Sequence, residues 1–74
     1  MLKEVLVNAL VSKYEAAVAV HSANIMVMIE NGVGVAEHPG TIETIDGEVA
    51  LLAEAEDKLS TVRRFAPSVP PKVV

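Results

Sequence analysis

Hydrophobic residues repeat with helical spacing through residues 2–30, a segment without glycine or proline. Residues alternately four and three apart share one face of the expected helix: Val7, Val11, Tyr14, Val18, His21, Ile25 and Met28. A second apolar set lies beside this face: Leu6, Leu10, Ala17, Val20 and Val27. Only a narrow stripe opposite is polar, formed by Glu4, Asn8, Ser12, Glu15, Ser22 and Glu30 and continued by Ala19 and Met26. A helix with so little polar surface needs cover on more than one side.

A second helix, with an ordinary solvent-exposed face, is predicted over residues 41–65. Its apolar stripe consists of Ile42, Ile45, Val49, Leu52, Leu59 and Val62, widened by Ala55 and Phe65. Polar residues lie off this stripe: Glu48, Glu54, Asp57, Lys58 and Arg64. Strict spacing from Leu52 to Leu59 would turn Glu56 inward, so we expect the stripe to shift to Ala55. Glu54 and Lys58 are four residues apart, which favours an ion pair on the exposed face.

Residues with special backbone preferences mark the helix ends. Asn31 and Gly32 tolerate the left-handed conformation that closes many helices. Thr41 is suited to cap the second helix; alternatively, His38 caps it and Pro39 occupies its first position.

A β-hairpin competes with the start of the second helix. Alternating residues flank Asp46-Gly47, a dipeptide that suits a type I′ turn. Glycine in a helix interior also costs about 1 kcal/mol relative to alanine. We favour the helix because its apolar stripe crosses Asp46-Gly47 without a break.

These elements predict an all-α helical hairpin: a helix over residues 2–30, a connection over 31–40, a helix over 41–65 and a proline-rich tail over 66–74. The 74 residues allow one domain at most. One partner helix cannot cover the first helix fully, so we expect two copies to pack as a four-helix bundle. The expected dimer interface consists of Leu6, Leu10, Tyr14, Val18, His21, Ile25 and Met28.

Composition and charge narrow the classes of function. The chain is 51% hydrophobic and has no cysteine, so it must rely on packing, without a disulfide or a cysteine-ligated zinc. Its six basic residues are scattered among ten acidic ones and form no basic face, which argues against nucleic acid as a partner. The longest apolar runs have five residues, far short of the about 20 that span a bilayer. We therefore expect no membrane partner and a cytoplasmic location.

The connection holds the most distinctive motif, Gly34, Glu37, His38 and Pro39 within a glycine-rich stretch. Glycines near a helix start can cradle phosphate, but the Gly-Lys-Ser/Thr of a P-loop is absent. Glu37 and His38 could form a metal site or an acid/base pair. We favour a structural interpretation, in which the glycines let the chain reverse between two helices.

His21 lies on the apolar face of the first helix and is a second candidate for metal binding. A partly buried histidine bonded to a backbone or partner group is the favoured interpretation, and a metal site shared with its symmetry mate is the alternative. No Ser/His/Asp arrangement and no Glu-x-x-His motif of a di-iron bundle occurs in the sequence. No catalytic residue, metal or cofactor is therefore predicted, and we expect the chain not to be an enzyme.

The connection and second helix resemble a family of small proteins encoded by marine cyanophages and found in ocean metagenomes. Those proteins carry a segment like Asn-Pro-Val-Gly-Val-Gly-Glu-His-Pro-Asp before an Ala/Glu-rich helix. The matching positions are Asn31, Val33, Gly34, Val35, Glu37, His38 and Pro39, followed by residues 53–59. Gly32, Ala36 and Gly40 depart from the pattern. Because the family has no assigned activity, the resemblance implies an origin and a helical hairpin but no catalytic residue.

We therefore expect a non-enzymatic structural or protein-interaction protein that acts as a homo-oligomer, of the kind a phage encodes as an accessory protein. A host or virion protein is a further expected partner. The alternative is a small metal- or ligand-binding bundle that uses His38 and Glu37, or His21.

Overall fold

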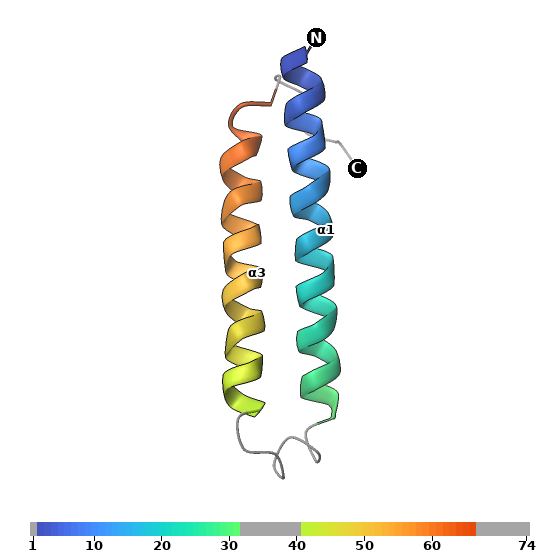
Figure 1. Cartoon of the computed structure of the whole chain (residues 1–74), viewed down its shortest axis with the longest axis vertical. Helices are drawn as coiled ribbons and strands as arrows, with labels where there is room; N and C mark the ends of the chain where they lie inside the picture. Colours follow the sequence, from blue (N-terminus) through green and yellow to red (C-terminus); the bar gives the residue numbers. More distant parts are fainter. Residues whose placement is uncertain (1, 32–40, 67–74) are drawn as a thin grey trace, which may run out of the picture.

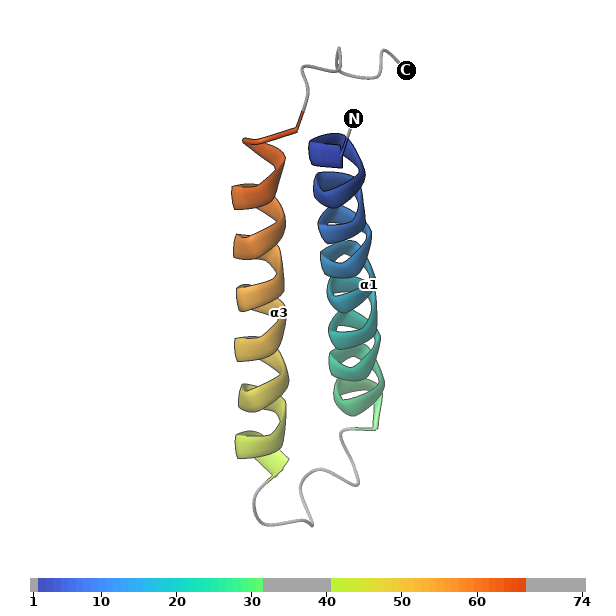
Figure 2. The same cartoon turned by 45° about the horizontal axis from the view of Figure 1, so that its top comes forward.

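The chain folds as two antiparallel α-helices that lie side by side. The computed structural model describes residues 2–31 and 41–66. Helix α1 spans Leu2–Glu30 and helix α3 spans Thr41–Arg63. Two views show the helices alongside each other, with the start of α1 near the end of α3 (Figure 1 and Figure 2). The all-α hairpin predicted from the sequence is confirmed.

Both helices begin where the sequence predicts, and α3 ends two residues before the expected position 65. Beyond Arg63, three backbone N–H groups in succession donate to the carbonyl oxygen three residues earlier, at 3.0–3.2 Å. This tighter turn ends α3 at Arg63. At the end of α1, the N–H of Asn31 donates to the carbonyl oxygen of Val27 at 3.1 Å. The alternative start of α3 at His38 and Pro39 lies outside the described residues.

The β-hairpin alternative around Asp46-Gly47 is wrong. Residues 41–63 form one continuous α-helix, and no residue of 2–31 or 41–66 belongs to a strand. Gly47 therefore lies in the interior of α3, where the strong helix-forming residues that follow it outweigh the local turn signal.

The two helices meet along one row of residues on each, which we call the inner seam. On α1 it is the predicted face, whose members are all buried or half-buried: Val7, Val11, Tyr14, Val18, His21, Ile25 and Met28. On α3 it has the same alternation of four and three residues: Ile45, Glu48, Leu52, Ala55, Leu59 and Val62. This spacing is that of helices packed at a small crossing angle, as in coiled coils.

The inner seam of α3 differs from the predicted stripe. Ile42, Val49 and Phe65, expected inside, are 70%, 45% and 59% exposed. Glu48, expected outside, is half-buried toward α1. Two rows flank the central residues 45, 52 and 59, one through residues 42, 49 and 56 and the other through 48, 55 and 62. The structure uses the second row, so the expected shift from Glu56 to Ala55 is confirmed.

The core of the hairpin is thin. Among the described residues only Val7, Ala55 and Val62 are buried, and twelve large hydrophobic side chains are exposed. Small domains already bury the smallest fraction of their unfolded surface. Among the described residues, two helices therefore leave many large apolar side chains in contact with water.

The position of Gly47 inside α3 predicts that alanine in its place stabilises the chain. A Cβ atom built at Gly47 meets no other atom within 4 Å, and the residue is exposed. Gly47→Ala should therefore raise the free energy of unfolding by about 1 kcal/mol, which raises the melting temperature by about 4–8 °C in a domain of this size.

Thermal unfolding followed by circular dichroism at one fixed protein concentration measures this change. Ala50→Gly, at an exposed position of the same helix, is the matched control and should lower the stability by about the same amount. A Gly47→Ala protein that is less stable than the parent would contradict the helix at this position.

Candidate functional site

A polar cluster interrupts the otherwise aliphatic inner seam. Nδ1 of His21 lies 2.6 Å from one carboxylate oxygen of Glu48. The side-chain nitrogen of Asn24 donates to the other carboxylate oxygen at 3.2 Å. The side chains of His21 and Glu48 are 21% and 19% exposed. Two side chains of α1 thus hold both oxygens of one carboxylate of α3 at the half-buried contact between the helices.

The hydrogen bond to Glu48 indicates which ring nitrogen of His21 is the donor. An ionised carboxylate can only accept a hydrogen bond, so Nδ1 of His21 must carry a hydrogen. This bond also holds the imidazole ring in one orientation. His21 is half-buried, as predicted, and its Nδ1 atom bonds the side chain of Glu48 on the neighbouring helix of the same chain.

Glu48 and Asn24 were not predicted as members of this cluster. The available signal was the spacing, because Ile45, Glu48 and Leu52 continue the alternation of three and four residues. Asn24 was not detectable in the same way, since it lies beside the inner seam of α1 and reaches Glu48 only because the helices fix its place.

A carboxylate that orients an imidazole is one part of many acid/base sites. Within residues 2–31 and 41–66, no three histidine or acidic side chains lie close enough together to hold a metal ion. The other candidates of the sequence, Gly34, Glu37, His38 and Pro39, lie outside the described residues. Among the described residues, the bonds of the cluster join α1 to α3.

The residues predicted for the dimer interface fall into two groups. Five of them are half-buried and belong to the inner seam of the same chain: Tyr14, Val18, His21, Ile25 and Met28. The other two, Leu6 and Leu10, are 56% and 39% exposed. The exposed residues of the predicted interface therefore lie on the side of Leu6 rather than at the inner seam.

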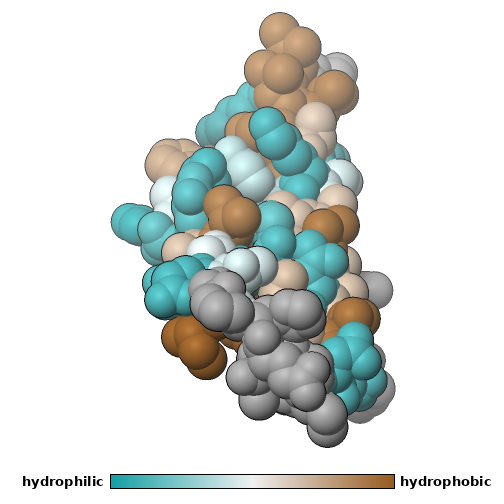
Figure 3. Space-filling model, turned by 60° about the horizontal axis from the view of Figure 1, so that its bottom comes forward, coloured by the Kyte–Doolittle hydropathy of each residue, from teal (hydrophilic) through white to brown (hydrophobic). Residues whose placement is uncertain are grey.

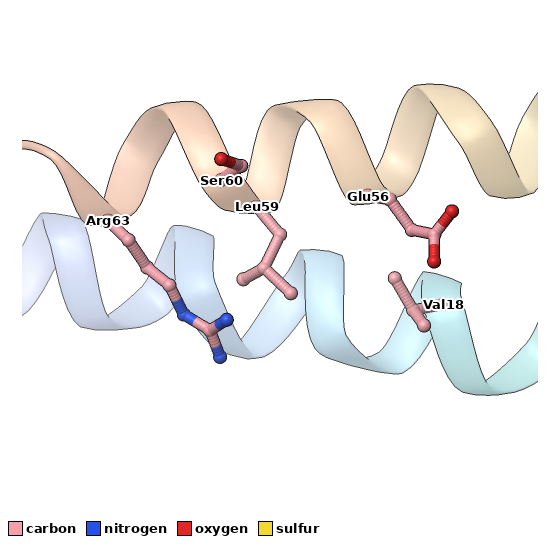
Figure 4. Close-up of a pocket in the computed structure, with 5 residues that line it drawn as sticks. All are labelled: Val18, Glu56, Leu59, Ser60 and Arg63. Atoms are coloured by element: carbon pink, nitrogen blue, oxygen red, sulfur yellow. The ribbon is translucent and has the colours of Figure 1, made fainter. Parts of the chain in front are cut away.

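A shallow open groove of about 370 Å³ follows one side of the helix contact. Leu59 of α3 and Val18 of α1 point toward each other across it, and Arg63 reaches toward α1 (Figure 4). The guanidinium of Arg63 bonds a carboxylate oxygen of Glu15 at 3.1 Å, with both side chains 54% exposed. An exposed pair of this kind contributes little stability. Ser60 and Glu56 complete the lining.

On the opposite side of the contact, Lys58 connects the two helices. Its Nζ atom lies 2.7 Å from a carboxylate oxygen of Glu54, which confirms the predicted pair, and 5.9 Å from the centre of the Tyr14 ring. The hydrogen bond from Lys58, followed by its positive charge, lowers the pKa of Glu54. The same bond and the charge of Glu54 raise the pKa of Lys58. Both side chains are at least half exposed, so the pair is a surface feature.

No protein-family model matches the chain, and neither a curated protein nor a solved structure is detectably similar to it. The resemblance to cyanophage proteins therefore stays a prediction. Neither of the described helices contains a stretch that is long and apolar enough to cross a membrane.

The polar cluster generates a second prediction. Glu48→Ala leaves Nδ1 of His21 and the amide of Asn24 without their shared acceptor. Because the site is half-buried and water can replace part of the loss, we expect the free energy of unfolding to fall by about 1 kcal/mol. Urea unfolding at a fixed protein concentration measures it.

Glu56→Ala is the matched control, since it removes an exposed carboxylate from the same helix and should change the stability by less than about 0.5 kcal/mol. Equal stability of the Glu48→Ala protein and the parent would show that the cluster contributes nothing to folding.

The ion pair of Glu54 and Lys58 predicts how the pKa of Glu54 responds when Lys58 is replaced. Lys58→Met keeps the aliphatic stem and removes the charge, so the pKa of Glu54 should rise toward its ordinary value. Because that pKa is lowered in the folded chain, the contribution of the pair is present at neutral pH and is lost as the pH falls through the pKa of Glu54. It is also lost at high pH, as the pH rises through the raised pKa of Lys58.

Carbon-detected NMR titration of the Glu54 carboxyl group measures this change. Lys13→Met is the control, because Lys13 borders the same side of the helix contact as Glu54 and makes no bond to it in the described structure. A pKa of Glu54 that responds equally to both substitutions would exclude the specific pair as its cause.

Proposed function

We propose that this chain is a non-enzymatic structural or protein-interaction protein that acts as a homo-oligomer, with α1 as the helix through which copies associate. The observation that carries the proposal is the outward surface of α1. Of the predicted second apolar set, Leu6, Leu10, Val20 and Val27 are all exposed, at 39–58%. In the same helix Leu2 and Val5 are also exposed, at 71% and 64%.

The exposed apolar residues of α1 are spread along the length of the helix. Single exposed hydrophobic residues are normal on soluble proteins, whereas contiguous apolar patches mark interaction sites. The space-filling view shows hydrophobic residues at several places on one face of the hairpin, between hydrophilic ones (Figure 3). On α1 the exposed apolar residues recur along the helix from Leu2 to Ile29, which supports a contact along the helix rather than at one end.

The proposal generates a fourth prediction, which uses two exposed positions of α1. Val20 lies in the second apolar set and Met26 on the polar stripe, and they are 54% and 61% exposed. Val20→Glu should weaken self-association at least tenfold, because burial of a valine side chain contributes about 1.5 kcal/mol or more and a carboxylate replaces it. Met26→Glu adds the same charge away from the contact and should leave association unchanged.

Sedimentation equilibrium across micromolar concentrations measures the effect. The parent should approach twice the chain mass of 7.8 kDa as the concentration rises. A folded parent that stays monomeric at every concentration would overturn the proposal. Equal weakening by both substitutions would show that a surface other than the second apolar set makes the contact.

A further inference from the structure

A complete second row of residues runs along α1 on the side away from α3. Its positions alternate four and three residues apart, as in the inner seam, and every one of them is exposed. We call this row the outer seam: Leu2, Leu6, Ala9, Lys13, Ala16, Val20, Ala23, Val27 and Glu30. Such spacing lets a second helix pack along the full length of α1.

We propose that a second copy of this chain packs its α1 antiparallel against the outer seam, with Ala16 at the two-fold axis. This inference rests on the proposed self-association and specifies its surface and direction. With Ala16 on the axis, Ala9 of one copy lies opposite Ala23 of its partner, and Leu6 lies opposite Val27. Alanine therefore faces alanine at the axis and again where Ala9 meets Ala23, and larger side chains meet at the positions between and beyond these pairs.

Charge along the outer seam selects the antiparallel direction. Lys13 and Glu30 are its only charged residues. In a parallel pair in register, Lys13 would face Lys13 of the other copy, and Glu30 would face Glu30. In the antiparallel pair Lys13 lies opposite Val20, and Glu30 lies opposite Leu2. Like charges directly opposed across an interface suppress the wrong arrangement and so set the register.

The charges of the whole hairpin select the same direction. We call residues 17–31 and 41–52 the acidic half, because they contain four acidic residues and no lysine or arginine: Glu30, Glu43, Asp46 and Glu48. We call residues 2–16 and 53–66 the mixed half, and it holds every basic residue of the described chain: Lys3, Lys13, Lys58, Arg63 and Arg64. The mixed half also holds five acidic residues, so its formal charges balance. A parallel pair places two acidic halves together, whereas an antiparallel pair places each acidic half beside a mixed half.

Cysteine cross-linking tests whether the two α1 helices are antiparallel. Because the chain has no cysteine, each variant carries a single thiol at a known position. Three single variants are needed, Ala9→Cys, Ala16→Cys and Ala23→Cys, each treated with a short bis-maleimide. In the antiparallel pair two copies of Ala9→Cys place their thiols about 21 Å apart along the helix axis, beyond the reach of the reagent. We expect little linked product from Ala9→Cys alone or from Ala23→Cys alone. When the two variants are mixed in equal amounts, random exchange makes half of the dimers mixed. About half of the chains in the mixture should therefore become linked.

The remaining variants separate the possible failures. Ala16→Cys should link to itself, because Ala16 lies on the axis. Asn8→Cys, on the exposed polar stripe, is the control for random collision and should not link. Efficient linking of Ala9→Cys or Ala23→Cys to itself would overturn the antiparallel direction. A failure of Ala16→Cys to link in a protein that sediments as a dimer would overturn the outer seam as the contact. A monomer in sedimentation would overturn the proposed self-association itself.

Discussion

Two straight helices touch each other along a single line, and this restriction governs the rest of the hairpin. Each helix can turn only one row of side chains toward the other, so a helix that is apolar on two sides keeps one of them in water. Helix α1 is such a helix, and α3 covers only its inner seam. The three buried residues, Val7, Ala55 and Val62, all belong to that line of contact. The thin core is therefore a consequence of having two helices and an unusually apolar first one.

Within the line of contact, one polar link has a role that the aliphatic residues cannot fill. Valine, isoleucine and leucine at regular spacing pack almost equally well after one helix slides past the other by a full repeat. The bonds of Glu48 to His21 and Asn24 form in only one register. Sliding would leave a half-buried carboxylate without its donors, which is costly. Polar residues in helical interfaces are known to fix register in this way, and the cluster is suited to do so here.

The sequence determined α1 more completely than α3, and the reason is physical. Along α1, the row from Val7 to Met28 has no competing row of equal length, so the helix and its apolar face could be predicted. That this face packs against α3 could not, because most of it was assigned to the dimer interface. Along α3 two rows compete, and each contains one glutamate, Glu56 or Glu48. Which of the two rows faces α1 depends on the side chains of α1 at the same level along the helix axis. Only in the folded hairpin do His21 and Asn24 lie next to Glu48. Of the candidate site, His21 could therefore be found from the sequence, and its partner could not.

The basic residues are placed unevenly along the long axis of the hairpin. With every described lysine and arginine in the mixed half, the hairpin is an electric dipole along its long axis, negative where α1 ends and α3 begins. Near a negatively charged surface, such a rod turns its mixed half toward the surface and its acidic half away from it. Two hairpins that point in opposite directions cancel each other's dipole. Antiparallel pairing would thus turn a rod with two distinct ends into a particle whose ends are alike and which has no preferred direction of approach.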